Sequence, residues 1–333
     1  LELFEQASLP NPLASSIDEH RLIRHPYGDH VGYARMIDPA FAAAMRALLE
    51  EALGNPSSGH WASVPAKSAL DNARRQVAAL LRCAADEVVF TSGGSEANNF
   101  AIKGTFFALR DKGEHIVTTQ IEHPAVLGPC RFLERLGAKV TYLPVDGYGR
   151  VDPEDVRRAV TPRTILITVM HANNEVGTIQ PLAEIGTIAR EHGIRFHTDA
   201  AQSLGKIPVH VAELGVDLLT VVGHKFYAPK GVGALYVRHG MTLEPLIHGG
   251  GHERGLRSGT ESALLAVGLG QACALAMDLE AMERIRALRD RLWHGLRPAF
   301  GDAVVLNGHP ELRLPNTLNV SFAGRIGAEV LAR

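Results

Sequence analysis

The sequence has few cysteines and no long apolar segment, and both shortages exclude whole classes of protein. Its 333 residues include three cysteines, Cys83, Cys130 and Cys273, which are widely spaced and form no C-x-x-C pair. This argues against a disulfide framework and against a zinc site. No apolar run approaches the ~20 residues of a membrane-spanning helix, and the first ten residues, L-E-L-F-E-Q-A-S-L-P, are acidic where a signal peptide would be basic. We therefore expect a cytoplasmic protein without a membrane segment.

An excess of charge of one sign is also missing. Lys and Arg total 34 against 36 Asp and Glu, the formal net charge is -2, and no run of like charge occurs. Nucleic acids and anionic membranes are bound by basic patches, so we expect neither as a partner and favour small, roughly neutral ones. The length and the 46% hydrophobic content allow a large core and more than one minimal domain.

Short β-rich runs alternate with helical patterns between residues 86 and 238. The runs are D-E-V-V-F, H-I-V-T-T-Q, K-V-T-Y-L-P-V, T-I-L-I-T-V-M, I-R-F-H-T-D, L-L-T-V-V and G-A-L-Y-V-R. This alternation predicts an α/β fold, a mostly parallel sheet with helices on both faces. The Ala- and Leu-rich stretch 262–296 predicts a long helix or a helix pair, followed by two strands of a smaller α+β unit. We expect an N-terminal arm (1–45), a large domain (46–261) and a small C-terminal domain (262–333).

One strand is followed by Ser-Gly-Gly-Ser in V-V-F-T-S-G-G-S-E-A-N-N. A helix that starts there places backbone N–H groups and the Ser92 and Ser95 hydroxyls around an anion, and such a site suits a phosphate. The stretch is not G-x-G-x-x-G, which disfavours a dinucleotide. The alternative is a tight turn in which Ser95 caps the helix.

Asp199 and Lys225 also follow predicted strands, and ligands of open α/β sheets bind beyond the carboxyl ends of strands. Taken singly, Asp199 could cap a helix and Lys225 could be a surface lysine. Together with the anion cradle they supply a carboxylate, an amine and a phosphate site. Pyridoxal phosphate needs all three, because its aldehyde bonds to a lysine, its phosphate needs N–H donors and its ring nitrogen pairs with an Asp.

His123 lies just beyond another strand, where an imidazole could stack on the cofactor or move a proton, although a structural histidine is the alternative. His197 and His224 could form a metal site with Asp199. No metal-ligand spacing supports that site, so we expect no metal.

Eight motifs occur in an order that resembles a known family. They are G-N-P-S-S-G-H, F-T-S-G-G-S-E-A-N-N, E-H-P-A-V, A-N-N-E-V-G-T-I-Q-P, H-T-D-A-A-Q-S-L-G, V-G-H-K-F-Y-A-P-K-G-V-G-A-L, G-G-G-H-E-R-G-L-R-S-G-T-E and L-P-N-T-L-N-V-S-F. From about Asp38 to Phe322 the chain resembles the NifS/IscS-like cysteine desulfurases and the related selenocysteine lyases, which are class V, fold-type I pyridoxal-phosphate enzymes.

The resemblance implies a role for each matching residue. Lys225 would bind the cofactor covalently, and Lys225 and His123 would be the catalytic pair, with His123 stacked on the pyridine ring. The other cofactor-binding residues would be Asp199 at the ring nitrogen, Gln202 at the phenolate oxygen, Gly94, Ser95 and His224 at the phosphate, Thr260 from the partner subunit of a homodimer, and Asn174 at the cofactor or the substrate carboxylate.

The implied activity is a cysteine desulfurase that converts L-cysteine to L-alanine and passes the sulfur to a cysteine persulfide. The implied partners are a sulfur acceptor or an iron-sulfur scaffold protein. Selenocysteine is the alternative substrate, because selenocysteine lyases share the V-G-H-K-F-Y run, in which Val222 replaces the phosphate-binding Ser of many members. The segment H-V-G-Y-A-R-M-I-D-P also departs from the Y-x-D-x-N-A-T-T-P-like strand of the family.

In the family, the nucleophilic cysteine and a carboxylate-binding arginine lie beyond the strand that corresponds to L-N-V-S-F, and none of the three cysteines fits that position. Either the C-terminal part is missing from this sequence, or the chain is a degenerate relative without sulfur transfer. Three further alternatives stay open: another class V enzyme such as an aminotransferase or C–S lyase, a non-catalytic binding protein, and a metal-dependent hydrolase.

Overall fold

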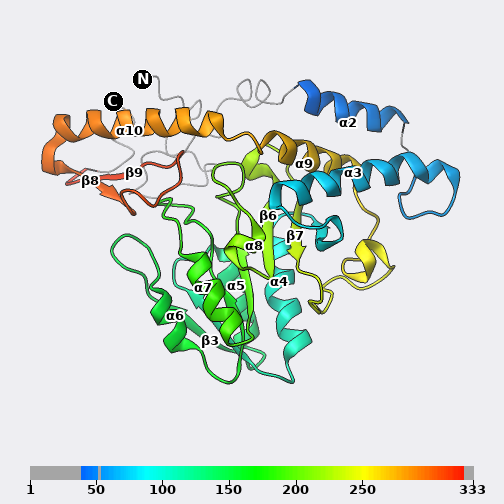
Figure 1. Ribbon diagram of the computed structural model, residues 1–333, viewed down its shortest axis with the longest axis horizontal. Coiled ribbons are helices and arrows are strands. Elements are labelled where there is room, and N and C mark those ends of the chain that lie inside the picture. Colours follow the sequence, from blue (N-terminus) through cyan, green and yellow to red (C-terminus); the bar gives the residue numbers. More distant parts are fainter. Residues whose placement is uncertain (1–38, 52–53, 326–333) are drawn as a thin grey trace.

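A seven-stranded sheet forms the centre of the computed structural model, which describes residues 39–51 and 54–325 (Figure 1). The strand order is β1-β7-β6-β5-β4-β2-β3. The strands are β1 (Val88–Thr91), β2 (His115–Thr119), β3 (Lys139–Leu143), β4 (Thr164–Thr168), β5 (Arg195–Asp199), β6 (Leu218–Val222) and β7 (Gly233–Val237). Only β7 runs antiparallel to its neighbours, β1 and β6, so β1 points the same way as the other five strands. The predicted mostly parallel α/β sheet is confirmed.

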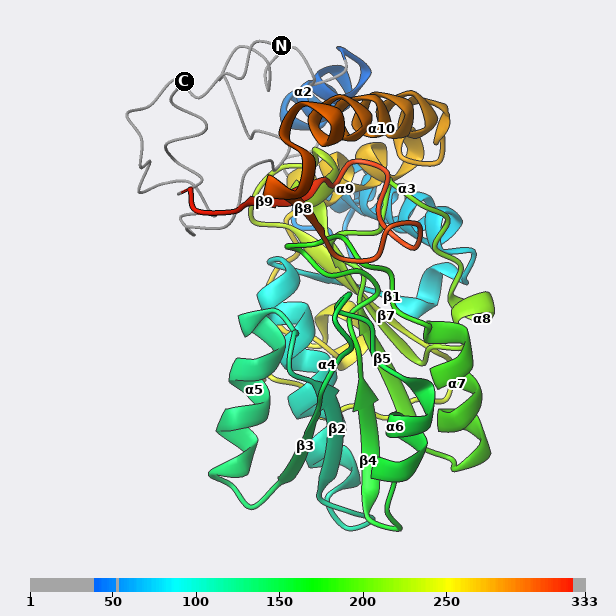
Figure 2. The same cartoon turned by 90° about the vertical axis from the view of Figure 1, so that its left-hand side faces the viewer.

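Helices cover both faces of this sheet (Figure 2). The α-helices are α2 (Pro39–Glu51), α3 (Val64–Leu81), α4 (Gly94–Leu109), α5 (Pro124–Glu134), α6 (Pro153–Ala159), α7 (Leu182–Glu191), α8 (Val211–Leu214), α9 (Ala263–Leu275) and α10 (Glu280–Phe300), and the 3-10 helices are η1 (Trp61–Ser63), η2 (Ala85–Glu87), η3 (Gly223–Phe226), η4 (His252–Gly255) and η5 (Gly301–Ala303). On one face, α4 and α5 pack against β2 and β4 through a buried cluster that includes Ile102, Val126 and Leu166. On the other face, α7 packs against β5 and α6 packs against α7 and β3, and Val156, Ile185 and Phe196 belong to one buried cluster.

The central strands are buried along their whole length. All five residues of β6, Leu-Leu-Thr-Val-Val, are buried, and the same holds for β4. Strands covered by helices on both faces read as continuous apolar runs rather than as alternating patterns. The buried polar side chain of His197 is accommodated by Thr168 Oγ1 at 2.8 Å from Nδ1 and Thr220 Oγ1 at 3.1 Å from Nε2. Burial lowers the pKa of His197 to about 3, so this imidazole is neutral.

The C-terminal part follows the predicted order of a helix pair and two strands. The helices α9 and α10 are separate, and the strands β8 (Val304–Asn307) and β9 (Asn319–Phe322) form an antiparallel pair. Leu292, Trp293 and Leu296 of α10 pack against this pair. The proposed three-part domain division stays a prediction. Of that division, residues 1–38 and 326–333 lie outside the described residues, as does most of the divergent H-V-G-Y-A-R-M-I-D-P segment.

The part of the chain that the structure describes has no single helix that is long and apolar enough to cross a membrane. The pair of α9 and α10 passes the same test of length and composition only when both helices are taken together, and the two are bent by 70° relative to each other.

Candidate functional site

Most of the predicted site residues lie at one edge of the sheet. The cradle follows β1, His123 follows β2, Asn174 follows β4, Asp199 ends β5, and Lys225 follows β6. These strands all point the same way, so their carboxyl ends share one edge. Ligands of open α/β sheets bind at this edge. The sequence predicted that the cradle, His123, Asp199 and Lys225 follow strands, and the topology brings these strand ends together.

The anion cradle is the turn between β1 and α4. Gly93 has φ 143° and ψ -174°, a conformation that favours glycine. Gly94 begins α4, and a Cβ on Gly94 would lie 2.4 Å from Val222 Cγ2, so a larger residue would not fit without a shift. The first hydrogen bond of the helix runs from Ala97 N to Gly93 O at 3.1 Å. The N–H groups of residues 94–96 precede that bond and are the donors a helix offers to an anion.

Asp199 is a buried carboxylate held from two sides. Asn98 Nδ2 donates to Asp199 Oδ2 at 2.6 Å, and Ala201 N donates to Asp199 Oδ1 at 2.9 Å. Burial raises the pKa of Asp199, and the two hydrogen bonds together with the charges of His123 and Lys225 offset this only in part. A cationic N–H partner would stabilise the charged form. The protonated ring nitrogen of a pyridine is such a partner, so this carboxylate fits the cofactor that the sequence predicted.

Lys225 lies in η3, directly after β6, and its side chain is half-buried. Burial and the charge of Lys225 both lower the pKa of His224, and burial is the larger cause. The charge of Lys225 also lowers the pKa of Asp199, against the effect of burial. His123 is exposed and caps α5, where its Nδ1 accepts a hydrogen bond from Ala125 N at 3.1 Å. In a neutral ring this leaves the proton on Nε2. The amine of Lys225 and the imidazole of His123 therefore both act electrostatically on the carboxylate of Asp199 at the sheet edge.

Three other predicted residues lie in loops. Asn174 is half-buried in the loop after β4, and its Nδ2 donates to Glu175 Oε1. Gln202 is half-buried in the turn that follows Asp199. Thr260 is exposed and lines a surface pocket with residues of α2 and of the loop at Asn55, and none of the other predicted site residues lines that pocket. Thr260 therefore lies apart from the other predicted site residues of its own chain, and its role in a second subunit stays a prediction.

Sequence reasoning missed two ionisable residues beside the site, the half-buried Lys206 and the buried Glu122. Lys206 Nζ donates to the carbonyl oxygen of Lys225 at 3.3 Å, and burial, helped by the charge of Lys225, lowers the pKa of Lys206 to about 7. Glu122 Oε1 accepts from Thr119 Oγ1 at 2.8 Å and from Met170 N at 2.9 Å, and burial raises the pKa of Glu122 to about 8. No local pattern marks Lys206, and Glu122 precedes the more conspicuous His123.

The three cysteines do not contribute a reactive thiol to this edge. Cys130 and Cys273 are fully buried inside α5 and α9, and Cys83 lies just after the end of α3. Burial raises the pKa of Cys83 and of Cys130 to about 12, and it also raises the pKa of Cys273. Thiolates are the reactive form, so these side chains are poor nucleophiles.

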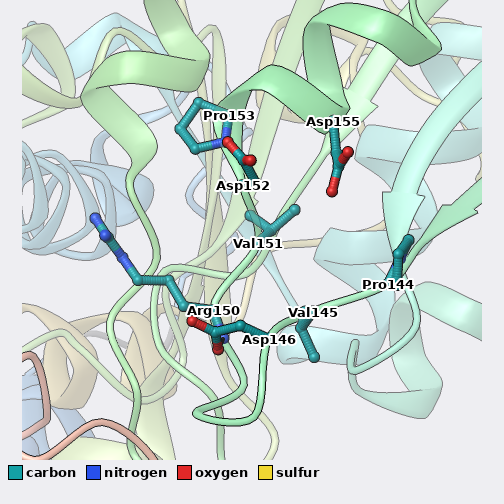
Figure 3. Close-up of a pocket in the computed structure, with 8 residues that line it drawn as sticks. All are labelled: Pro144, Val145, Asp146, Arg150, Val151, Asp152, Pro153 and Asp155. Atoms are coloured by element: carbon teal, nitrogen blue, oxygen red, sulfur yellow. Dashed lines mark hydrogen bonds between the residues drawn. The ribbon is translucent and has the colours of Figure 1, made fainter.

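Within residues 39–51 and 54–325, no group of three or more His, Cys, Asp or Glu side chains is arranged to hold a metal ion. A surface pocket of about 490 Å³ is lined by Asp146, Arg150, Asp152, Asp155 and apolar neighbours of the same segment, 144–155 (Figure 3). Its carboxylates are already used locally: Asp146 and Asp152 accept backbone N–H groups, and Asp155 pairs with Arg158. None of the predicted site residues lines it.

Comparison with known proteins places this arrangement in a family. The family model described as Aminotransferase class-V matches residues 34–332. The protein named cysteine desulfurase IscS of Dictyoglomus turgidum is 52% identical over 291 residues, which is 86% of this chain and 73% of the relative. The protein of the same name from Methanosarcina thermophila is 50% identical over 281 residues, 84% of this chain and 69% of the relative.

Solved structures agree with these relatives. A NifS-like protein superposes with a TM-score of 0.82 and 40% identity over 86% of this chain and 78% of the other. A structure described as SspA in complex with cysteine has a TM-score of 0.78 and 40% identity over 87% of this chain and 82% of the other. The family model spans the cradle, Asp199 and Lys225, and identities of this size extend over most of both chains. The chain therefore belongs to the class-V aminotransferase family and, within it, to the cysteine desulfurases.

Proposed function

We propose that this protein is a pyridoxal-phosphate-dependent cysteine desulfurase. Class-V aminotransferases and cysteine desulfurases depend on pyridoxal phosphate in general. The observation that carries the proposal is the buried Asp199 carboxylate, which lies at the same sheet edge as Lys225 and the anion cradle. A carboxylate, an amine and a set of helix N–H groups at one edge match the three polar parts of this cofactor.

Each residue has a proposed part in holding the cofactor. Lys225 would bind its aldehyde carbon, Asp199 would keep its ring nitrogen protonated, and the amides of Gly94 and Ser95 would donate to its phosphate, with His224 beside them. His123 would stack on the ring, Gln202 would donate to the phenolate oxygen, and Asn174 would orient the cofactor or the substrate carboxylate. When bound, the cofactor supplies an electron sink that makes the α-carbon of an amino acid acidic.

The chain's own residues then handle the proton. Lys225 follows β6 at this edge, so we assign to its Nζ the transfer of the substrate α-proton. His123 carries its proton on Nε2 and would serve as the second proton donor. A lysine amine and an imidazole are suitable groups for such proton transfers.

The overall reaction is balanced by an acceptor thiol. The Cβ–S bond of L-cysteine breaks, the released sulfur forms an S–S bond with the acceptor thiolate, and Cβ takes a proton, which yields L-alanine and a persulfide. None of Cys83, Cys130 and Cys273 is a suitable acceptor, because their thiols are protonated and two of them are fully buried. We therefore assign the acceptor thiol to a group outside the 333 residues of this sequence, such as a partner protein that serves iron-sulfur cluster assembly.

The test measures L-alanine and sulfide formed from L-cysteine by the purified protein loaded with pyridoxal phosphate, with dithiothreitol as acceptor. Equal amounts of both products are expected, and Lys225→Ala should form neither. Parallel reactions with L-selenocysteine distinguish the two substrates that the sequence left open. Unchanged turnover by Lys225→Ala would refute the assignment, and alanine without sulfide or persulfide would indicate a different class V reaction.

A further inference from the structure

A strained loop lies beside the anion cradle. Within η4, Glu253 has φ 47° and ψ 41°, and Arg254 has φ 58° and ψ 32°. Two successive residues with side chains in the left-handed region are unusual, because the Cβ of each crowds the backbone. Such a conformation persists only where the surroundings hold it in place. We call residues 253–257 the bracing loop, and its side chains reach both sides of the cradle turn.

The first contact is to the strand that leads into the cradle. The carboxylate of Glu253, whose side chain is 1% exposed, accepts from Arg74 Nη1 and Nη2, both at 2.7 Å, and from Phe90 N at 2.9 Å. Arg74 Nη1 and Arg254 Nη2 both donate to Val88 O, at 2.6 and 2.8 Å. A buried bidentate pair of this kind has a fixed geometry. It therefore fixes the position of β1 two residues before the turn begins.

The second contact is to the helix that leads out of the cradle. Arg257 Nε donates to Glu96 Oε1 at 2.8 Å, and Arg257 Nη2 donates to Glu96 Oε2 at 3.3 Å. Glu96 Oε2 also accepts from Ser92 N at 2.8 Å, across Gly93 and Gly94. The Arg257 and Glu96 side chains are 24% and 14% exposed, so solvent screens this pair only in part. Arg257 therefore holds the residue that closes the turn from the helix side.

The charges in this contact matter as well as its geometry. Glu96 lies in the first turn of α4, where an unneutralised carboxylate would repel a bound phosphate. Burial raises the pKa of Glu96, but the hydrogen bonds from Arg257 and Ser92 outweigh it and leave the pKa lowered. Glu96 is therefore ionised, and Arg257 neutralises it beside the anion site.

We propose that Glu253 and Arg257 of the bracing loop are positioning residues that hold the cradle turn in its phosphate-binding shape. The proposal rests on the cofactor site proposed above. The two contacts flank the turn, one on the strand before it and one on the helix after it. The loop itself need not touch the cofactor, and its effect should be confined to the phosphate end of the ligand.

The test compares two ligands that differ by the phosphate alone. Pyridoxal phosphate and pyridoxal share the aldehyde and the ring nitrogen, so both use Lys225 and Asp199, but only the first uses the cradle. Dissociation constants for both are measured by absorbance titration of the wild-type apoprotein and of Arg257→Gln. We expect Arg257→Gln to weaken pyridoxal phosphate binding about tenfold, because a charge-assisted contact is lost, while pyridoxal binding stays within about twofold.

The matched control is Arg163→Gln. Arg163 also donates to a glutamate, Glu114, through Nε and Nη2, but the two residues precede β4 and β2 and so lie at the amino ends of the strands. This variant should leave both dissociation constants unchanged. If Arg257→Gln does not fold, as judged by circular dichroism, Arg257→Lys keeps the charge but loses the two-point contact with Glu96 and should show a smaller loss that is again confined to pyridoxal phosphate.

The outcomes separate the two proposals. A wild-type protein that binds pyridoxal phosphate no more tightly than pyridoxal would contradict the cofactor site itself. A wild-type preference for the phosphate that is equally strong in Arg257→Gln and Arg257→Lys would overturn the bracing role and leave the cofactor site standing. Equal weakening of both ligands would also overturn it, because that result indicates general disruption.

Discussion

At the scale of the residue, replacing Asp199 should lower activity much more than it lowers stability. Its pKa is raised by burial, so the folded apoprotein gains little from its charge. We predict that Asp199→Asn lowers alanine formation about 100-fold or more, because the ring nitrogen loses its anionic partner. The free energy of unfolding of the apoprotein should fall by about 1 kcal/mol, since Asn keeps the shape but its single amide oxygen replaces only one of the two acceptors used by Asn98 and Ala201. Urea unfolding and turnover together check this, and a loss of stability matching the loss of activity would contradict it.

Lys206 gives a prediction about pH. Burial lowers its pKa in the folded protein from 10.5 to about 7, so between these values the unfolded chain binds more protons than the folded one. The free energy of unfolding should therefore rise as the pH increases from about 7 to 10.5. Below about 7 the contribution of Lys206 to stability is lost. Lys206→Met, which keeps the volume without the amine, should lack this rise of unfolding free energy with pH. Urea unfolding of both apoproteins at several pH values across the window tests this, and parallel profiles would show that Lys206 is not a buried, neutral amine.

The cysteines give a prediction about reactivity. Cys130 and Cys273 should not react with a thiol reagent until the protein unfolds, because both are buried and their pKa values are raised. Cys83 should react slowly for the same electrostatic reason. Mass spectrometry after incubation with L-cysteine should find no persulfide on any of the three. A persulfide on one of them at a level near one per chain would show that the acceptor thiol had been misassigned.

At the scale of the element, the packing of α9 on α3 depends on a glycine. A Cβ on Gly270 would lie 2.5 Å from Gln76 Oε1 and 2.7 Å from Ala73 Cα. We expect Gly270→Ala to lower the free energy of unfolding by about 1–3 kcal/mol through overpacking. Gly295 in α10 is the matched control, because nothing lies within 4 Å of its added Cβ. Gly295→Ala should leave stability unchanged or raise it by up to about 1 kcal/mol through helix propensity. Thermal or urea unfolding distinguishes the two, and similar effects would contradict the close contact.

Much of the fold and part of the site could be predicted at this scale. L-L-T-V-V is β6 with the same five residues, because a strand buried on both faces is a short apolar run between turn residues. The placement of Asp199 and Lys225 after strands followed from the same boundaries. The bracing loop could not be predicted, since Arg74 and Glu253 are 179 residues apart and each reads as a surface charge. The left-handed conformation of Glu253 and Arg254 also runs against the preference of residues with side chains.

At the scale of the whole molecule, the proposed homodimer can be tested by complementation. Thr260 is exposed on its own chain, and we propose that it completes the phosphate site of a second copy. A mixture of Lys225→Ala and Thr260→Ala chains should then recover activity, because the mixed dimer contains one site with both wild-type residues. Mixed dimers can reach at most about half of the wild-type activity, because only one of their two sites is intact. Activity no higher than the sum of the two separate variants would place both residues in the same chain's site.

The covalent bond between Lys225 and the cofactor is the central claim for the whole site. The most direct test loads the protein with pyridoxal phosphate, reduces it with borohydride and maps the modified peptide by mass spectrometry. We predict a single reduced adduct on Lys225 and none at that peptide in Lys225→Ala. An adduct on Lys206 or Lys230 instead, or no adduct on a protein that still forms alanine from cysteine, would contradict the account.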